Sequence, residues 1–320
     1  MKRYGESKEI RAEMEMEVFY QQLVEKGFQP LWKAEPLKKY TSWKIGGPAD
    51  ILYAPPDYRA CVEVLKMARQ AGVPVTFLGA GTNVLVADEG VRGLVILTTN
   101  WREVTWDEQG TKVTSGAGVP IAALSRLAGE RGLTGLEYAV GIPGTLGGAV
   151  IMNAGAYGCA LEQVLTSVKT LDEEGKLREY QKGEMALGYR TSIFQGKKEL
   201  IVEATLALQP GKIDEIRAKM NEYLKLRREK QPLDLPSAGS IFKNTERGAG
   251  RLVEAAGAKG WRIGDAQVSK KHANFIVNLG EAKAADVLAL IAEVQKAAQR
   301  QFNVELETEI VLLGFQDTGR

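Results

Sequence analysis

The stretch GIPGTLGGAVIMNAGAYG, residues 141–158, contains six glycines and no charged side chain. Glycine has no Cβ atom and adopts positive φ readily, so another group can approach its backbone closely. In such a segment, successive backbone N–H groups converge easily on an anion. A second stretch, LGAGTN at 78–83, has the same character and comes at the end of a predicted strand. Two matched loops predict a site in which the backbone binds a diphosphate.

Glycines also serve ordinary structural purposes. A single loop of this kind is explained as well by turns and tight packing, and only the presence of two favours a ligand. The residues after Gly148 are compatible with a helix, whose N-terminus would add partial positive charge. Residues 79–84 imitate G-x-G-x-x-G, but Val84 replaces the last glycine and no acidic residue ends a second strand about 20 residues later. We therefore exclude a classical NAD-binding domain.

Composition bounds the class of protein. The chain has 320 residues, enough for roughly two domains at about 150 residues each. Its 44% apolar and 26% charged residues are typical of a globular protein. The net charge of +2 gives no field suited to nucleic acid. The first 20 residues carry charges throughout and no apolar stretch reaches membrane-spanning length, so we expect a cytoplasmic protein with no membrane span.

Few side chains in this sequence suit metals or disulfides. Cys61 and Cys159 are the two cysteines and His272 is the one histidine. This excludes a disulfide framework and makes a zinc site hard to assemble. We expect no metal, so any redox chemistry must come from a bound organic cofactor.

Hydrophobic spacing predicts a mixed fold. Residues 57–71 are expected to form a helix that buries Cys61, Val64, Leu65 and Ala68. Near residue 210, short strands interrupted by glycine-rich turns give way to a long helical segment, and we place a domain boundary there. The remaining predicted helices cover 120–132, 210–232 and 283–301, and the main predicted strands cover 73–79, 92–99, 167–170, 200–208, 272–280 and 303–314.

Six sequence blocks, in this order, resemble the UDP-N-acetylenolpyruvoylglucosamine reductase family. The resemblance runs from about residue 37 to residue 314, and six ordered blocks are far more specific than one glycine loop. The blocks are TSWKIGGPAD (41–50), LGAGTNVLV (78–86), GIPGTLGGAVIMNAGAYG (141–158), GYRTSIF (188–194), SAGSIFKN (237–244) and GDAQVSKKHANFIVN (264–278).

The resemblance implies a fold and a cofactor. The expected class is α+β, with a vanillyl-alcohol-oxidase-like FAD-binding fold of two subdomains and a C-terminal α+β substrate domain. The expected divisions are an N-terminal helical extension at 1–36, the FAD-binding domain at 37–209, split near residue 105, and the substrate-binding domain at 210–320. The residues expected to bind FAD are Gly79, Ala80, Gly81, Thr82, Asn83, Gly141, Pro143, Gly144, Thr145, Gly147 and Gly148.

The reaction implied by the resemblance is the NADPH-dependent reduction of UDP-N-acetylglucosamine enolpyruvate to UDP-N-acetylmuramate, a peptidoglycan precursor. A hydride from flavin N5 adds to the alkene, negative charge builds on the neighbouring carbon and its carboxylate, and a proton follows. The resemblance assigns Arg190 and Glu309 to the enolate and Ser240 to the proton. A planar guanidinium suits a carboxylate that is becoming an enediolate.

Two of these residues have further requirements. Serine is a poor acid, so a nearby cation must stabilise the alkoxide that Ser240 leaves, and Lys230 is a candidate. Strand alternation puts Glu305, Glu307 and Glu309 on one face, which turns apolar after Glu309. We expect two of these acids to be solvated and Glu309 to be buried, which would raise its pKa.

The resemblance assigns substrate binding to Tyr157, Arg227, Lys230 and Asn244. Arg227 continues the apolar stripe of its helix, so it should point inward. The ordinary alternatives are a surface ion pair for arginine, a turn hydroxyl for serine, and a favourable helix dipole for the cations near the C-terminus of the helix predicted over 210–232. Only eleven residues separate Arg190 from Val202, so the chain resembles a compact branch that lacks a long insertion.

Two other functions share part of this pattern. An FAD-dependent oxidase or dehydrogenase of a small hydroxy acid would share the glycine loops but would not require Arg190, Ser240 and Glu309 together. A nucleotide-sugar-binding regulatory protein could keep the fold without turnover, and the complete set of three residues argues against it. We expect no nucleic acid and no obligate protein partner.

Overall fold

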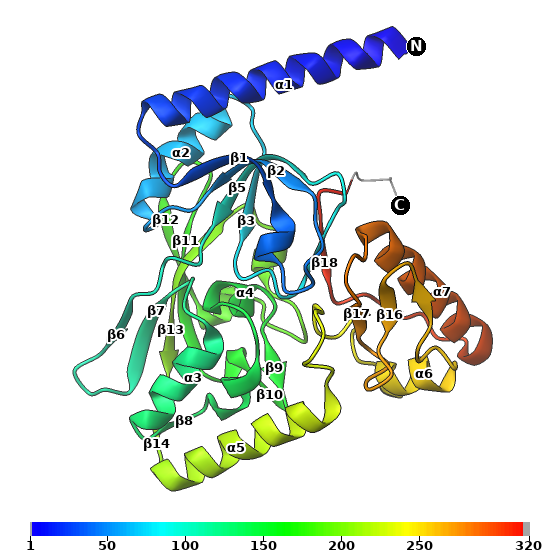
Figure 1. Cartoon of the computed structure of the whole chain (residues 1–320). Coiled ribbons are helices and arrows are strands. Elements are labelled where there is room, and N and C mark those ends of the chain that lie inside the picture. The colour runs from blue at the N-terminus through cyan, green and yellow to red at the C-terminus, as the bar shows by residue number, and fades with distance from the viewer. Residues whose placement is uncertain (1, 316–320) are drawn as a thin grey trace.

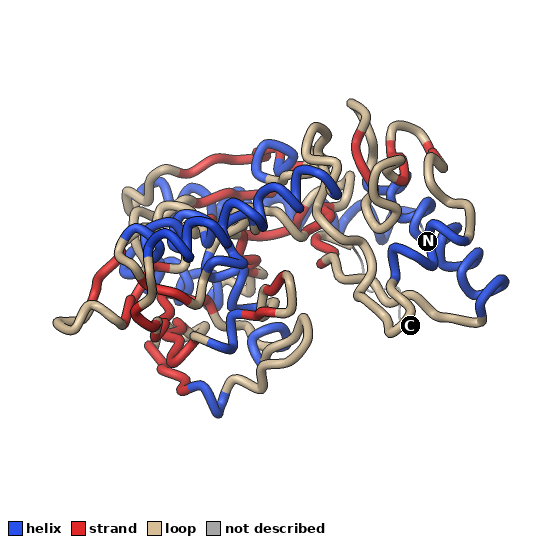
Figure 2. Tube along the Cα trace, turned by 90° about the horizontal axis from the view of Figure 1, so that it is seen from below, coloured by secondary structure: helices blue, strands red, loops and turns tan. Residues whose placement is uncertain are grey.

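The structure is a computed structural model that describes residues 2–315. It has three parts, two built on sheets and a smaller C-terminal one (Figure 1). Seen from below, the molecule is elongated, with the two sheet-based parts at one end and the C-terminal part at the other (Figure 2).

The first part is built on a four-stranded sheet. In order across the sheet, the strands are β1 (Leu31–Pro36), β2 (Pro48–Tyr53), β5 (Val91–Leu97) and β3 (Val75–Leu78). Helices α1 (Lys2–Glu25) and α2 (Arg59–Gln70) contribute side chains to its core. The buried residues of α2 are Cys61, Val64, Leu65 and Ala68, the four that hydrophobic spacing predicts.

The predicted N-terminal extension divides into two pieces. Helix α1 covers most of it, and Phe19 and Leu23 are buried in the main hydrophobic core. The last six residues of the extension form β1, which pairs antiparallel with β2. Residues 31–36 therefore belong to the first sheet. They form its edge strand, which directly follows α1 in the chain.

The second part is an antiparallel sheet with helices packed against it. Its strands, in order, are β12 (Leu177–Gln181), β11 (Leu165–Leu171), β13 (Leu200–Ala207), β7 (Lys112–Gly116) and β6 (Val104–Trp106). Helices α3 (Ile121–Glu130) and α4 (Leu146–Ile151) and the 3-10 helix η2 (Glu137–Gly141) follow between β7 and β11. The strands predicted at 167–170 and 200–208 lie within β11 and β13, which pair with each other, and β11 also forms a hairpin with β12.

Helix α5 (Ile213–Lys230) packs against η2 and α3 of this second part. It lies along the side of the molecule that carries α3 (Figure 1). We expected this helix to be the first element of the C-terminal domain, because the pattern of short strands and glycine-rich turns ends just before it. The apolar stripe of a helix does not specify which part of the molecule the helix packs against. Because α5 packs against η2 and α3, we propose that the domain boundary lies after the helix, near residue 231.

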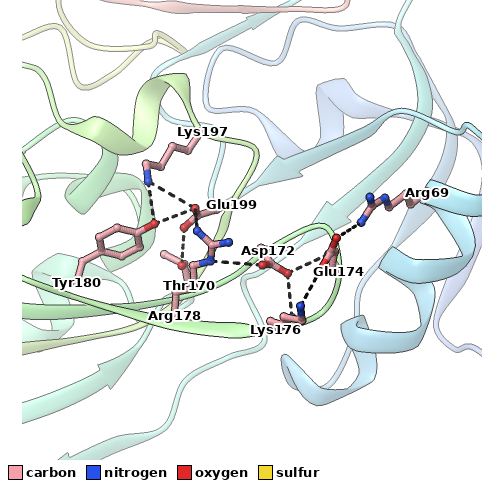
Figure 3. A network of polar contacts seen from close by, with 9 residues as sticks. All are labelled: Arg69, Thr170, Asp172, Glu174, Lys176, Arg178, Tyr180, Lys197 and Glu199. Carbon is pink, nitrogen blue, oxygen red and sulfur yellow. Dashed lines mark hydrogen bonds and ion pairs between the residues drawn. The ribbon is translucent and has the colours of Figure 1, made fainter.

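An ionic network ties the first two parts together. Arg69 of α2 donates to Glu174 at 2.7 Å, and Glu174 lies in the turn of the β11–β12 hairpin. Gly175 in the same turn has φ +74°, and a Cβ there would lie 2.8 Å from Val62 of α2. Figure 3 shows how this contact continues through the hairpin to Glu199. The turn is thus fitted closely against α2.

The C-terminal part combines a small antiparallel sheet with two helices. Its elements are α6 (Ala249–Ala255), β15 (Arg262–Ile263), β16 (Ala266–Val268), β17 (Ile276–Asn278) and α7 (Ala284–Phe302). The chain then returns to the first part, where β18 (Val311–Leu313) pairs in parallel with β4 (Val84–Val86). The predicted strand at 303–314 is too long, because its earlier residues find only one bridge, between Thr308 and Phe242.

Side chains of the first part also enter the core of the C-terminal part. Trp43, Ile45 and Leu85 are buried in the same hydrophobic cluster as the residues of α6 and α7. Within residues 2–315, no helix has the length and apolar character needed to cross a membrane. The remaining short elements are η1 (Leu37–Tyr40), β8 (Leu133–Thr134), β9 (Gly155–Ala156), β10 (Cys159–Ala160), η3 (Leu161–Gln163), η4 (Lys182–Glu184), η5 (Ile193–Gly196) and β14 (Gln209–Pro210).

Candidate active site

The two glycine loops lie against each other. The hydroxyl of Thr82 donates to the carbonyl of Pro143 at 3.3 Å. A Cβ at Gly79 would lie 2.6 Å from Oγ1 of Thr145, and one at Gly144 would lie 2.8 Å from Oγ1 of Thr82. Such distances are shorter than real Cβ contacts. The loops therefore approach as closely as they do because both positions are glycine.

The polar groups of these loops fit an anionic ligand. Within the described chain, no acceptor takes the N–H groups of residues 79–83. The Oγ1 atom of Thr145 is buried without a hydrogen-bond partner among the described residues. A Cβ at Gly148 would meet little, its nearest neighbour being 3.8 Å away. Unpaired donors beside open backbone are what a diphosphate such as that of FAD requires.

A pocket of about 600 Å³ lies between the second part and the C-terminal part. It gathers four residues that the sequence resemblance assigned, namely Arg190, Ser240, Asn244 and Glu309. These residues come from segments up to 119 positions apart in the chain. The other lining residues are Tyr189, Phe242, Thr245, Glu246, Gly248, Gly250, Arg251, Glu254, Lys271, His272, Ala273 and Asn274.

Arg190 and Glu309 form an ion pair at this pocket. Nε of Arg190 donates to Oε1 of Glu309 at 2.8 Å, and Nη2 donates to the carbonyl of Gly155 at 2.9 Å. The two charged side chains are only 20% and 14% exposed. Burial raises the pKa of Glu309 above its usual value, and Arg190 offsets part of that rise. The prediction that burial raises the pKa of Glu309 is confirmed, and Glu305 and Glu307 are exposed as expected.

A tight turn presents Arg190 to the pocket. Gly188 and Thr191 exchange two backbone hydrogen bonds, of 3.1 and 3.2 Å, which leaves Tyr189 and Arg190 at the tip. Arg190 has φ +55°, a conformation that residues other than glycine rarely adopt. Nδ2 of Asn153 donates to the carbonyl of Gly188 at 2.9 Å and supports the turn. Backbone strain of this kind is typical of functional sites.

Main-chain hydrogen bonds place Ser240 beside Glu309. The N–H of Ile241 donates to the carbonyl of Asn274 at 2.9 Å, and the N–H of Glu309 donates to the carbonyl of Ile241 at 2.8 Å. The side chain of Asn274 bonds both the N–H and the carbonyl of Phe242, at 3.0 and 2.9 Å. The segment that carries Ser240 is thus held on both sides.

The other predicted substrate residues lie outside this pocket. Tyr157 stacks on Tyr223 of α5 with ring centroids 4.3 Å apart, and its hydroxyl donates to the Tyr223 carbonyl at 3.0 Å. Arg227 is half-buried as expected, and burial lowers its pKa. Its stem lies against the glycine loop, since a Cβ at Gly141 would be 2.9 Å from Cδ of Arg227. Lys230 is exposed at the end of α5.

Comparison with known proteins agrees with this geometry. Residues 49–181 match the family model described as FAD binding domain, and residues 231–313 match the C-terminal domain of UDP-N-acetylenolpyruvoylglucosamine reductase. A relative with that reductase name, from Caldanaerobacter subterraneus, is 45% identical over 89% of this chain and 94% of its own length. The chain belongs to the UDP-N-acetylenolpyruvoylglucosamine reductase family.

Two further similarities extend across nearly the whole chain. The reductase of Moorella thermoacetica is 45% identical over 88% of this chain and 92% of its own length. The crystal structure of UDP-N-acetylenolpyruvylglucosamine reductase from Thermus caldophilus superposes with a TM-score of 0.74 at 36% identity, covering 89% of this chain and 98% of that one. These similarities confirm the α+β fold with an FAD-binding domain and a C-terminal α+β domain.

Membership in the reductase family also defines the class of enzyme. The chain is an FAD-dependent oxidoreductase of peptidoglycan precursor synthesis. The C-terminal family model begins at residue 231, directly after α5, which supports the boundary proposed from the contacts of that helix.

Two residues that line the pocket of this reductase were not among the predicted site residues. Lys271 lines the pocket, and its Nζ donates to the carbonyl of Arg228 at 2.6 Å. His272 also lines it, its Nδ1 accepts from the N–H of Asn274 at 3.2 Å, and burial lowers its pKa. The hydrogen bond to the main chain is typical of a structural histidine. Both residues lie in the sixth block of the family resemblance, which was the available signal.

Proposed function

We propose that this chain catalyses the NADPH-dependent reduction of UDP-N-acetylglucosamine enolpyruvate to UDP-N-acetylmuramate. The observation that carries the proposal is one pocket of about 600 Å³ lined by the Arg190–Glu309 ion pair and Ser240. The enolpyruvyl group would occupy this pocket. The cytoplasmic location expected from the sequence stays a prediction.

The glycine loops would hold the cofactor. Bound FAD supplies the redox chemistry, namely acceptance of a hydride from NADPH and its delivery to the terminal alkene carbon of the substrate. The N–H groups of residues 79–83 and the hydroxyl of Thr145, which have no partner among residues 2–315, would donate to its diphosphate. Neither loop contains a lysine or arginine, so backbone dipoles must supply the attraction.

Arg190 would stabilise the charge that builds on the substrate carboxylate. Its guanidinium is largely buried, so its field acts in a medium of low dielectric constant where it has a strong effect. Glu309 would hold the guanidinium in place through the 2.8 Å hydrogen bond. Because that bond uses Nε, the other nitrogen atoms remain for the substrate and for the carbonyl of Gly155.

Ser240 would complete the reaction by giving its hydroxyl proton to the carbon next to the carboxylate. The addition of one hydride and one proton reduces the alkene and leaves the ether intact. The alkoxide left on Ser240 needs a nearby cation, and Lys271 is the better candidate because it lines the pocket whereas Lys230 does not.

Further contacts would bind the nucleotide sugar. Asn244 lines the reaction pocket. In the described chain the guanidinium of Arg227 has neither a hydrogen bond nor an ion pair, although it is half-buried next to Tyr157. A half-buried cation without a partner suits a phosphate. We therefore propose Arg227 and Tyr157 as contacts of the anionic part of the ligand, and Lys230 as a contact at its outer edge.

The test is a visible spectrum of the purified holoenzyme, recorded without oxygen. We expect the flavin band to bleach on addition of NADPH and to return on addition of the enolpyruvyl nucleotide sugar. A protein that cannot be loaded with FAD would contradict the proposal. A bleached band that returns only with oxygen would instead support an FAD-dependent oxidase of a small hydroxy acid.

A further inference from the structure

Tyr189 makes two specific contacts although it is not part of the hydrophobic core. Its hydroxyl accepts a hydrogen bond from the backbone N–H of Asn244 at 3.0 Å. Its ring lies under the guanidinium of Arg190, with Cζ 5.0 Å from the ring centroid. The residue is 56% exposed and lines the reaction pocket. A large aromatic side chain at such a site contributes little to burial, so its contacts serve the pocket.

The hydroxyl contact joins two separate parts of the molecule. Tyr189 belongs to the turn that presents Arg190, in the second part of the molecule. Asn244 lies four residues after Ser240, in the C-terminal part, and its side-chain Oδ1 accepts from the N–H of Ala249 at 3.0 Å. Because Ala249 begins α6, the hydrogen bond from Asn244 links the turn to the segment between Ser240 and that helix.

The ring contact acts on Arg190 itself. This guanidinium already bonds Glu309 and the carbonyl of Gly155. The face of the Tyr189 ring attracts the guanidinium electrostatically, which adds a third contact to these two hydrogen bonds. The backbone of Arg190 has φ +55°, which is intrinsically unfavourable for arginine. The contacts of its side chain must therefore help to stabilise this conformation.

We infer that Tyr189 is a positioning residue of the reductase, in which the hydroxyl latches the Asn244 segment across the pocket and the ring orients Arg190. The kinetic consequences rest on the proposed function, whereas the latch itself is a physical contact of the protein. The compact branch lacks the long insertion after Arg190, and this latch joins the two walls of the pocket at that position.

The first experiment measures hydrogen exchange of the Asn244 amide in the holoenzyme. Tyr189→Phe keeps the ring and removes the acceptor, so we expect this amide to exchange about 3- to 10-fold faster. Tyr180→Phe is the matched control, because its hydroxyl bonds Glu199 at 2.9 Å in the network of Figure 3. Unchanged exchange in Tyr189→Phe would overturn the latch whatever reaction the protein catalyses.

The second experiment follows reoxidation of the reduced holoenzyme by the enolpyruvyl nucleotide sugar. For Tyr189→Phe we expect the half-saturating concentration to rise about 3- to 10-fold, with the maximal rate constant within about 2-fold of the parent. For Tyr189→Leu, which also removes the ring, we expect the maximal rate constant to fall by about 3- to 10-fold.

These outcomes separate the inference from the proposed function. A parent protein that the nucleotide sugar does not reoxidise would refute the function, and amide exchange would still decide the latch. If the parent is reoxidised and Tyr189→Phe keeps the parent's half-saturating concentration, the positioning role is wrong.

Discussion

Ser240 is required in only one half of the proposed reaction. Its hydroxyl makes no hydrogen bond within the described chain, so it is free to turn toward a ligand in the pocket. The proton it would supply is needed when the alkene is reduced, and the reduction of the flavin by NADPH does not need it. General acids of this kind typically contribute about 10²- to 10⁴-fold.

We therefore expect Ser240→Ala to lower the rate constant of flavin reoxidation by about 10²-fold or more, with flavin reduction by NADPH nearly unchanged. Stopped-flow absorbance measures the two half-reactions separately. Ser237→Ala, which removes a nearby hydroxyl outside the pocket, is the matched control. Equal losses in both half-reactions would show that Ser240 has another role.

Glu309 should make the rate constant of flavin reoxidation fall at acid pH, which appears as an acid limb in its pH profile. Burial raises the pKa of this carboxyl, so protonation begins at a higher pH than for an exposed glutamate. Protonation removes the charge that pairs with Arg190, and the rate should fall as pH decreases through the raised pKa. By linkage, the folded state binds this proton more tightly, so the contribution of Glu309 to stability decreases as pH rises through the same window.

Measurement of the reoxidation rate constant against pH checks this expectation. In Glu309→Gln the side chain keeps its shape but no longer titrates, so we expect a lower rate constant and no acid limb from this residue. The same acid limb in both proteins would assign it to another group.

At the scale of elements, the glycine loops depend on close packing as well as on backbone freedom. Gly79 separates these effects, because its φ is not positive while a Cβ would lie 2.6 Å from Oγ1 of Thr145. We expect Gly79→Ala to push the loops apart at a cost of about 1–3 kcal/mol and to weaken FAD binding by about 10-fold or more. Flavin fluorescence during FAD titration measures this affinity.

Gly183→Ala is the control for that experiment. This glycine lies in η4, its φ is not positive and a Cβ there would meet nothing within 4 Å. FAD affinity should be unchanged in the control. An equal affinity in Gly79→Ala would mean that the loops tolerate separation and that the close contact is not part of the cofactor site.

The elements also show how far the sequence specifies the structure. Helix α2 was predictable because its four apolar residues bury one face. The strand predicted over 303–314 has the right alternation, but beyond the single bridge of Thr308 only residues 311–313 pair as a strand, with β4. The alternation of apolar and polar residues describes a single strand and does not indicate which strand it pairs with. For the same reason, the apolar stripe of α5 did not reveal that its partner is the second part.

The candidate site was predictable to a similar degree. The family resemblance supplied Arg190, Ser240 and Glu309, which line one pocket. Tyr189 was missed, although it precedes Arg190 in the same block, because its contact with Asn244 depends on the turn and on how two distant parts meet. Such contacts have no local signature in the chain.

At the scale of the whole molecule, the pocket exists only while the C-terminal part stays docked on the other two. The carboxylate of Asp88, in the first part, accepts from the N–H groups of Ala284 and Ala285 at 2.8 and 3.0 Å. These are the first residues of α7, so a side chain from one part caps a helix of another. Nδ2 of Asn83, in the first glycine loop (78–83), also donates to the carbonyl of Glu309 at 3.1 Å.

We expect Asp88→Ala to reduce the free energy of unfolding by about 1 kcal/mol, since a helix cap contributes about 0.5–2 kcal/mol. Asp88→Asn keeps an oxygen acceptor and should lose less. Because the cap lies between parts, we further expect amide exchange in α7 and at Glu309 to rise together in Asp88→Ala. Denaturant unfolding followed by hydrogen exchange tests both. Exchange confined to the first turn of α7 would mean that docking does not depend on this cap and rests on other contacts, such as the burial of Trp43 and Ile45 and the β4–β18 pairing.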